Sequence, residues 1–315
     1  MKLKSVLEGA ATLLPGALLL YRTRTGGTDS ARYCYAVWLR HLVLAQRSGL
    51  RGFPLAVAEL GPGDSIGIGL AALLSGAERY LGLDLVAHTS LERNLSVLDE
   101  LIELFSRRSP IPDDQEFPEL KPRLPRYAFP ADILSDGRHA DALAPGRRER
   151  IRRAVRAPLA PDSMIRYCAP WFDSAVIEPG SVDVIFSQAV LEHVDDLEGA
   201  YAAMRRWLRP GGLVSHQIDF RSHGTAHEWN GHWAYSDLAW KLVRGRRPYL
   251  LNRQPRSTHA RLLAAHGFRV VFEQAATLAS GIPRPRLAQR FRDMPEEDLT
   301  TAGWFVQAVA PAQAS

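Results

Sequence analysis

The sequence predicts an α/β protein in which apolar strands of a largely parallel sheet alternate with helices. Two strand-like apolar runs, residues 53–58 and 80–83, each lead into an acidic residue, Glu59 and Asp84. A helix-like spacing of apolar residues lies between them, which is the order of a βαβ unit. The same alternation resumes near residue 164 and continues almost to the end of the chain. A chain of 315 residues can hold one large domain or two small ones.

A glycine turn follows the first apolar run, in the order Gly61-Pro62-Gly63. Glycine permits a tight turn and lets a ligand approach the backbone. Asp84 follows about twenty residues later, at the carboxyl end of the second strand, where it can accept hydrogen bonds from ribose hydroxyls. A turn without a ligand, and a helix-capping role for Asp84, remain the structural alternatives. The pattern favours a dinucleotide or S-adenosylmethionine as ligand.

Composition sets broad limits on the class of protein. Hydrophobic residues make up 46% and charged residues 23% of the chain, which is ordinary for a globular protein with a core. A net charge of +5 permits an acidic partner without requiring nucleic acid. Two cysteines, Cys34 and Cys168, exclude a multi-bridge disulfide framework and a four-cysteine zinc site. The scarcity of cysteine fits a reducing compartment and favours a cytoplasmic location.

The first part of the chain, residues 1–52, is predicted to form a helical extension, with its best helix at residues 33–46. An apolar stretch at residues 10–20, broken by Pro15, is too short to span a bilayer as a helix. No small-x-small cleavage site follows it. We expect an ordinary packed helix there, with peripheral contact to a membrane surface as the second interpretation and a cleaved signal as the third.

Residues 53–315 are predicted to form the main domain, interrupted by a long insertion at residues 87–163. Six prolines fall within residues 110–130, so that segment cannot form a regular helix or a central strand. Six arginines fall within residues 147–156, which we interpret as a solvated helix face rather than a phosphate-binding surface. We expect the insertion to lie outside the sheet and to help cover the active site.

The second half of the chain alternates again between strands and helices. Residues 182–186 are mostly apolar, which suits a buried parallel strand. A helix is expected to begin at Asp195 and Asp196 and to stop before Pro210-Gly211-Gly212. The other expected elements are strands at residues 165–168, 213–218, 268–272 and 304–309, and a helix at residues 256–266.

Four segments of this pattern together resemble the class I S-adenosylmethionine-dependent methyltransferases. They are residues 59–63, Asp84, residues 187–194 and residues 208–212. The resemblance implies a Rossmann-like sheet of seven strands whose last strand is antiparallel. It also implies that S-adenosyl-L-methionine is the cofactor and lies across the carboxyl ends of the first strands, where open α/β sheets bind ligands.

By resemblance, six residues would bind the cofactor: Glu59, Gly61, Gly63, Asp84, Ser187 and Gln188. The first three would hold the amino-acid part, Asp84 the ribose, and the last two would border the methionine end. The chain departs from the family at the end of the third strand, where many relatives carry an acid that contacts the adenine amino group. Here Asp173 comes late, so backbone groups and packing on Trp171 are the expected adenine contacts.

Methyl transfer from a sulfonium is an in-line substitution, which requires alignment, exclusion of water and, for some acceptors, removal of a proton. The chain lacks the Asn/Asp-Pro-Pro-aromatic motif of amino-methylating relatives and a two-cysteine RNA mechanism, which argues against nucleic acid as the acceptor. We therefore expect a small-molecule, glycan or lipid-linked acceptor. A nicotinamide-dependent oxidoreductase and a noncatalytic scaffold that keeps the fold are the alternatives.

A histidine-rich segment, residues 216–235, follows the expected fifth strand and is predicted to form the acceptor pocket. Histidine can accept a proton near neutral pH. His223 is our first choice for a general base, Asp219 would orient it, and His193 is the fallback from the neighbouring loop. A loop with surface histidines and a metal site are the two other interpretations of this segment.

Overall fold

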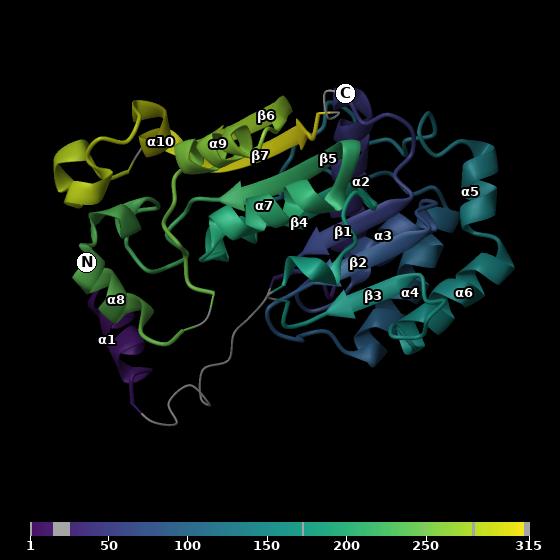
Figure 1. Ribbon diagram of the computed structural model, residues 1–315, viewed down its shortest axis with the longest axis horizontal. Helices are drawn as coiled ribbons and strands as arrows, with labels where there is room; N and C mark the ends of the chain where they lie inside the picture. The colour runs from purple at the N-terminus through teal and green to yellow at the C-terminus, as the bar shows by residue number, and fades with distance from the viewer. Residues whose placement is uncertain (1, 15–25, 172, 248, 279–280, 312–315) are drawn as a thin grey trace.

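The computed structural model describes residues 2–14, 26–171, 173–247, 249–278 and 281–311. Its centre is one sheet of seven strands in the order β3-β2-β1-β4-β5-β7-β6 (Figure 1). The strands are β1 Ala56–Leu60, β2 Arg79–Leu83, β3 Ile165–Cys168, β4 Val182–Gln188, β5 Leu208–Asp219, β6 Arg269–Thr277 and β7 Thr301–Val309. Both neighbours of β7 pair with it in antiparallel fashion, while β1 to β5 pair in parallel. The predicted α/β fold and its antiparallel last strand are confirmed.

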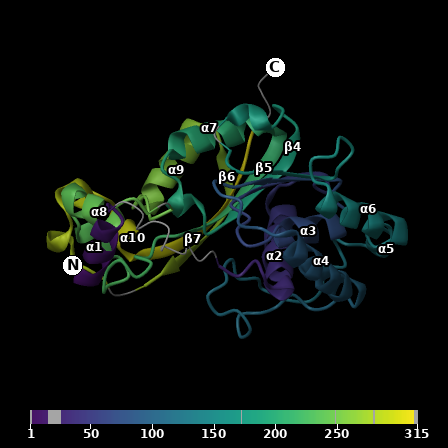
Figure 2. The same ribbon diagram turned by 90° about the horizontal axis from the view of Figure 1, so that it is seen from below.

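Helices cover both faces of the sheet (Figure 2). They are α1 Leu3–Ala11, α2 Ala31–Ser48, α3 Gly67–Leu74, α4 Leu91–Ser106, α5 Asp136–Ala142, α6 Pro145–Arg156, α7 Leu197–Trp207, α8 Asp237–Arg244, α9 Arg256–Ala265 and α10 Glu296–Thr300. Neighbouring strand residues point to opposite faces. Val57 therefore joins the core with α2, α3 and α4, whereas Ala58 joins the core with α7 and α9.

The observed strands differ from the expected ones mainly at their ends. The first strand was expected at residues 53–58 but begins at Ala56 and extends through Leu60. Pro54 therefore lies before the strand, as expected for a residue without an N–H to donate to the ladder. The sixth strand, expected at residues 268–272, runs to Thr277 because it pairs with β7 along most of its length.

The described residues 87–163 contain helices α4, α5 and α6 and no strand. The arginine-rich segment is helix α6, which buries Ile151 and Val155 and exposes Arg150, Arg153 and Arg156. Arg147 is docked instead: its side chain is only 12% exposed, pairs with Glu78 at 2.8 Å and donates to the carbonyl oxygens of Leu73 and Ala77. Part of α6 is thus a solvated face, and the residues that bound the insertion stay a prediction.

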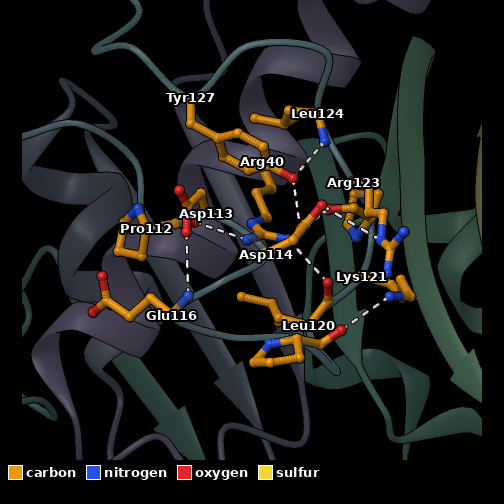
Figure 3. Close-up of polar contacts among 12 residues, drawn as sticks. Arg40, Pro112, Asp113, Asp114, Glu116, Leu120, Lys121, Arg123, Leu124 and Tyr127 are labelled. Atoms are coloured by element: carbon orange, nitrogen blue, oxygen red, sulfur yellow. Dashed lines mark hydrogen bonds and ion pairs between the residues drawn. The ribbon is translucent and has the colours of Figure 1, made fainter.

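Residues 112–127, which we call the strap, cross over α2 and are held by one buried arginine (Figure 3). Arg40 of α2 is fully buried, and its guanidinium lies 4.9 Å from the ring centre of Tyr127. Its two terminal nitrogens donate four hydrogen bonds, to the carboxylate of Asp114 and to the carbonyl oxygens of Pro112, Leu120 and Pro122. The strap has no regular secondary structure, yet its path is fixed, because the Arg40 side chain donates to carbonyl oxygens that are not paired in a β-sheet.

The N-terminal helices lie in two different places. Helix α2 is buried in the core against α3 and α4, while α1 pairs with α8 at one end of the molecule (Figure 1). Most of the apolar stretch at residues 10–20 lies outside the described residues. Among the helices that the structure describes, none is long and apolar enough to cross a membrane. A domain boundary at residue 52 stays a prediction.

Candidate functional site

The glycine turn follows β1 and is hydrogen-bonded to the carboxyl end of β2. Gly61 and Gly63 have φ angles of +67° and +73°, in the region that favours glycine. The N–H of Gly61 donates to the carbonyl oxygen of Leu83 at 2.7 Å. The N–H of Gly63 donates to the Asp84 carboxylate at 3.2 Å, and that of Leu85 does so at 2.7 Å. The turn and the carboxylate therefore form one unit at the edge of the sheet.

Two adjoining cavities open at this edge. The glycine-turn cavity, of about 400 Å³, lies against Gly63, Thr28, Tyr33 and His223. The α7 cavity, of about 760 Å³, lies between the loop after β3 and helix α7. They share five wall residues: Gly61, Asp84, Val190, His193 and Tyr249. Their position is the carboxyl edge at which open α/β sheets bind ligands.

Four of the six residues expected to bind the cofactor line the glycine-turn cavity: Gly61, Gly63, Asp84 and Gln188. Glu59 and Ser187 are buried and are not among the described wall residues of either cavity. The Tyr80 hydroxyl donates to the Glu59 carboxylate at 2.6 Å, and the Ser187 hydroxyl lies 2.8 Å from Nδ1 of His216. Burial raises the pKa of Glu59 to about 8. Both residues lie beneath the edge, and a direct cofactor contact stays a prediction for them.

The loop after β3 provides the far wall of the α7 cavity. Trp171 and Asp173 both line it, together with Ala203 and Arg206 of α7. The Trp171 ring meets the Trp207 ring edge to face, with centroids 5.4 Å apart. Asp173, the acid that comes late after the third strand, thus lines the same cavity as the Trp171 ring.

The structure brings His193, His223 and Asp219 together. Nε2 of His223 lies 3.2 Å from the Asp219 carboxylate, and the two histidine rings are 5.2 Å apart. Burial alone would raise the pKa of Asp219, but hydrogen bonds from His223 and Arg221 hold it below its ordinary value. Asp219 is therefore a carboxylate, which fixes the ring of His223 and leaves its Nδ1 for other partners.

His193 lies in the wall that the two cavities share. Burial and the neighbouring His223 lower the pKa of His193 to about 4, so the ring is neutral near pH 7. Its Nδ1 is buried and has no hydrogen-bond partner among the described residues. A ring with so low a pKa is a poor proton acceptor near pH 7, so His193 is suited to a neutral, positioning role in this wall.

The backbone of the glycine-turn cavity is strained at three residues other than glycine. Ala189, His223 and Tyr249 have φ angles of +55°, +45° and +56°. Such conformations cost about 1–3 kcal/mol each and cluster at functional sites. They bring side chains from three separate loops into one wall.

Most of the histidine-rich segment lies elsewhere. His216 and His232 are buried, and burial lowers the pKa of each to about 3, while His227 is exposed. Among these residues only His223 lines the glycine-turn cavity. In the part of the chain that the structure describes, no group of three or more His, Cys, Asp or Glu side chains could hold a metal ion.

Sequence reasoning missed several wall residues of the glycine-turn cavity: Thr28, Tyr33, His88, Tyr249 and Leu250. They come from loops and from the start of α2. Tyr33 falls in a helix that the sequence did predict, but its apolar spacing indicated packing only. No local motif distinguishes the others.

Part of the chain is similar to a known domain family. Residues 144–215 match the family model of a methyltransferase domain, while no curated protein matches the sequence. Among solved structures, an S-adenosylmethionine-dependent methyltransferase from Mesorhizobium loti is 15% identical, with a TM-score of 0.40, and 90% of this chain and 100% of that chain are covered.

Two further structures were solved with the cofactor or its product. Phosphoethanolamine N-methyltransferase 2 from Haemonchus contortus, with S-adenosyl-L-methionine, is 17% identical with a TM-score of 0.41, covering 91% of this chain and 58% of that one. Magnesium protoporphyrin IX methyltransferase from Synechocystis PCC 6803, with bound SAH, is 10% identical with a TM-score of 0.40, covering 93% and 90%. Residues 144–215 thus match a methyltransferase domain, and the sheet has the seven strands and the antiparallel β7 that the resemblance to class I S-adenosylmethionine-dependent methyltransferases implies.

Proposed function

We propose that the protein transfers a methyl group from S-adenosylmethionine to a proton-bearing atom of a small-molecule, glycan or lipid-linked acceptor. One observation carries the proposal. The two cavities meet at Asp84, and the wall around that junction contains the neutral His193 and the Asp219-oriented His223. A site for the cofactor and a group that can take a proton are thus a few side chains apart.

Each part of the cofactor has a matching surface. The Asp84 carboxylate suits the ribose hydroxyls, and the α7 cavity with Trp171 suits the flat adenine ring. The glycine turn, whose backbone has no side chains at Gly61 and Gly63, and the nearby Thr28 leave room for the amino-acid part. Glu59 would support this turn from below through β1 and Tyr80.

The cofactor, when bound, supplies an electrophilic methyl group on a sulfonium. During transfer, the carbon–sulfur bond breaks and a bond from carbon to the acceptor atom forms. The proton of the acceptor passes to Nδ1 of His223, while Asp219 holds the opposite nitrogen and stabilises the resulting cation. The neutral ring of His193, in the wall that the two cavities share, packs beside the acceptor and positions it.

The walls favour an acceptor without a dense negative charge. Among its described wall residues the glycine-turn cavity has no lysine or arginine, but it has Tyr33, His88, Gln188 and Tyr249. Nucleic acid backbones are bound by clusters of lysine and arginine. The polar and aromatic wall therefore supports a hydroxyl- or amine-bearing acceptor rather than a polynucleotide.

Calorimetric titration with S-adenosylhomocysteine and, separately, with NAD tests the proposal. We expect S-adenosylhomocysteine to bind and NAD to give no heat of binding. Binding of NAD in preference would support the nicotinamide-dependent oxidoreductase. Binding of neither compound to the folded protein would support the noncatalytic scaffold.

A further inference from the structure

Helices α1 and α8 form a parallel pair at the end of the molecule farthest from α5 and α6 (Figures 1 and 2). At the start of the pair, the N–H of Lys2 donates to the Tyr235 hydroxyl at 2.9 Å. At its end, the N–H of Arg246 donates to the Thr12 hydroxyl at 2.8 Å. The two helices therefore run in the same direction, level with each other along their length.

The two sides of α1 differ sharply. Ser5 and Gly9 of the helix are buried, as is Thr12 directly after it. A side-chain carbon at Gly9 would lie 2.1 Å from the carbonyl oxygen of Leu242, so the backbones of α1 and α8 touch there. At about 100° per residue, Leu3 and Leu7 fall on the opposite side of the helix, and Leu14 lies in the turn after it. These three leucines are 71%, 60% and 64% exposed.

Helix α8 repeats this arrangement. Trp240 and Val243 are buried in a small apolar cluster, while Leu238 and Leu242 are 73% and 41% exposed. Thirteen large hydrophobic side chains are exposed in the described chain, and six of them lie in α1, the turn after it, and α8: Leu3, Leu7, Leu13, Leu14, Leu238 and Leu242. Such a concentration of apolar surface marks an interaction site.

The charge around these leucines indicates what they bind. The acids of the pair are already used, because Asp237 binds Arg253 at 2.8 Å and Glu8 lies 3.8 Å from Lys4. Lys241 and Arg246 are exposed, and neither forms an ion pair with another described residue. Exposed leucines bordered by unpaired cations are complementary to the interface of a bilayer that contains anionic lipids.

We propose that the α1–α8 pair docks on a membrane surface that carries anionic phospholipids. Leu3, Leu7, Leu14, Leu238 and Leu242 would enter the interface, with Lys241 and Arg246 at the level of the headgroups. The chain that leaves α8 contributes Tyr249 and Leu250 to the glycine-turn cavity. Docking would therefore bring that cavity next to the lipid surface.

Vesicle sedimentation tests the proposal with the full chain. We expect the wild type to sediment with vesicles of equal parts phosphatidylcholine and phosphatidylglycerol, and only weakly with phosphatidylcholine alone. The triple variant Leu3→Ser, Leu7→Ser, Leu238→Ser should lose at least about tenfold in partitioning, because leucine burial drives interfacial binding. The matched control, Leu55→Ser, Leu91→Ser, Leu159→Ser, changes three exposed leucines elsewhere and should bind like the wild type.

Charge and self-association separate the alternatives. Lys241→Glu with Arg246→Glu should weaken binding to the mixed vesicles about tenfold and leave the weak binding to phosphatidylcholine unchanged. S-adenosylhomocysteine titration of each variant checks its fold and does not depend on lipid. The proposal is overturned if the wild type stays in the supernatant, or if the control variant loses as much binding as the α1–α8 variant. A dimer that the α1–α8 variant abolishes, without vesicle binding by the wild type, would instead assign the leucines to a second copy of the chain.

Discussion

The strap and the carboxyl edge of the sheet are both irregular, yet they use polar groups in opposite ways. Along the strap, Arg40 donates four hydrogen bonds that tie residues 112–127 to helix α2. At the edge, Nδ1 of His193 is buried without a partner among the described residues, and its ring lines both cavities. Native proteins rarely leave such groups unpaired. Nε of Arg40 is also buried without a partner among the described residues, but it lies away from both cavities, so the difference is one of place: the strap serves the fold, and the edge has a cavity that can take a ligand.

The largest expected effect is on turnover, at the edge. Replacing His223 by alanine should lower the rate of methyl transfer by about 10²–10⁴-fold, the usual cost of losing a general base. S-adenosylhomocysteine affinity should change little, because a general base acts on the proton of the acceptor and not on the cofactor. Single-turnover kinetics with a cognate acceptor, compared with calorimetric titration, measures both quantities.

The control for this variant is His227→Ala, which changes an exposed histidine four residues away. It should keep wild-type turnover. Near-normal turnover of His223→Ala would show that the proton goes to another group, with His193 the next to replace. Loss of cofactor affinity and turnover together would make His223 part of the cofactor site.

A second prediction concerns the strap and is expected to affect stability. Arg40→Met should lower the free energy of unfolding by about 3 kcal/mol, because it leaves three carbonyl oxygens without this donor and removes one of the partners of the Asp114 carboxylate. Urea unfolding measures the loss. Arg32→Met is the matched control, since Arg32 also lies on α2 and pairs with the strap at Glu116, but at the surface.

Surface ion pairs contribute about 1 kcal/mol or less, so the Arg32 variant should stay close to the wild type. Equal losses for the two variants would contradict the anchoring role of Arg40. A stable Arg40→Met protein with weakened S-adenosylhomocysteine binding would reverse the comparison, because the strap would then serve the site.

The third prediction uses pH to examine Glu59, which lies under the edge. Its pKa, raised by burial to about 8 in the folded protein, exceeds the unfolded value near 4.5. Stability from this group is complete below the unfolded pKa and is lost as the pH rises through about 8. Wild-type stability should therefore fall relative to Glu59→Gln by about 2 kcal/mol between about pH 5 and pH 7.

Denaturant unfolding of both proteins across this range tests the prediction. Parallel curves for the two proteins would show that Glu59 has an ordinary pKa, and hence that its carboxylate is solvated or paired. A wild-type stability that rises relative to Glu59→Gln as the pH rises would have the wrong sign and would contradict the burial argument.

Sequence reasoning recovered what is local or periodic. The glycine turn and Asp84 follow from chain spacing, and the observed contact between Gly63 and Asp84 confirms that the two lie together. The strap was predicted to avoid regular structure from its prolines. Its anchor was not, because Arg40 sits in an apolar helix pattern and binds carbonyls more than seventy residues away.

The site was predicted less completely than the fold. Asp219, His223 and His193 were named in the right neighbourhood, because each follows the end of a central strand or belongs to a loop beside it. Tyr249 was missed, since its position in the wall depends on a left-handed backbone conformation that no sequence pattern marks. Ser187 illustrates the converse, because its place in a family motif did not show that its hydroxyl would bond to His216 inside the core.

The most direct test of the comparison is the unfolding free energy of Asp84→Asn, measured with and without S-adenosylhomocysteine. Asparagine keeps one oxygen, which can accept from the N–H of Leu85, but its NH2 group cannot accept from Gly63, so the variant loses the charge and that 3.2 Å hydrogen bond. Without ligand, the variant should therefore lose about 1 kcal/mol relative to the wild type. With saturating ligand, its stabilisation should fall short of the wild type by about 1.5–3 kcal/mol, because charge-assisted hydrogen bonds to the ribose are lost. A variant that is destabilised on its own but gains as much from the ligand as the wild type would show that Asp84 serves the fold instead of the cofactor.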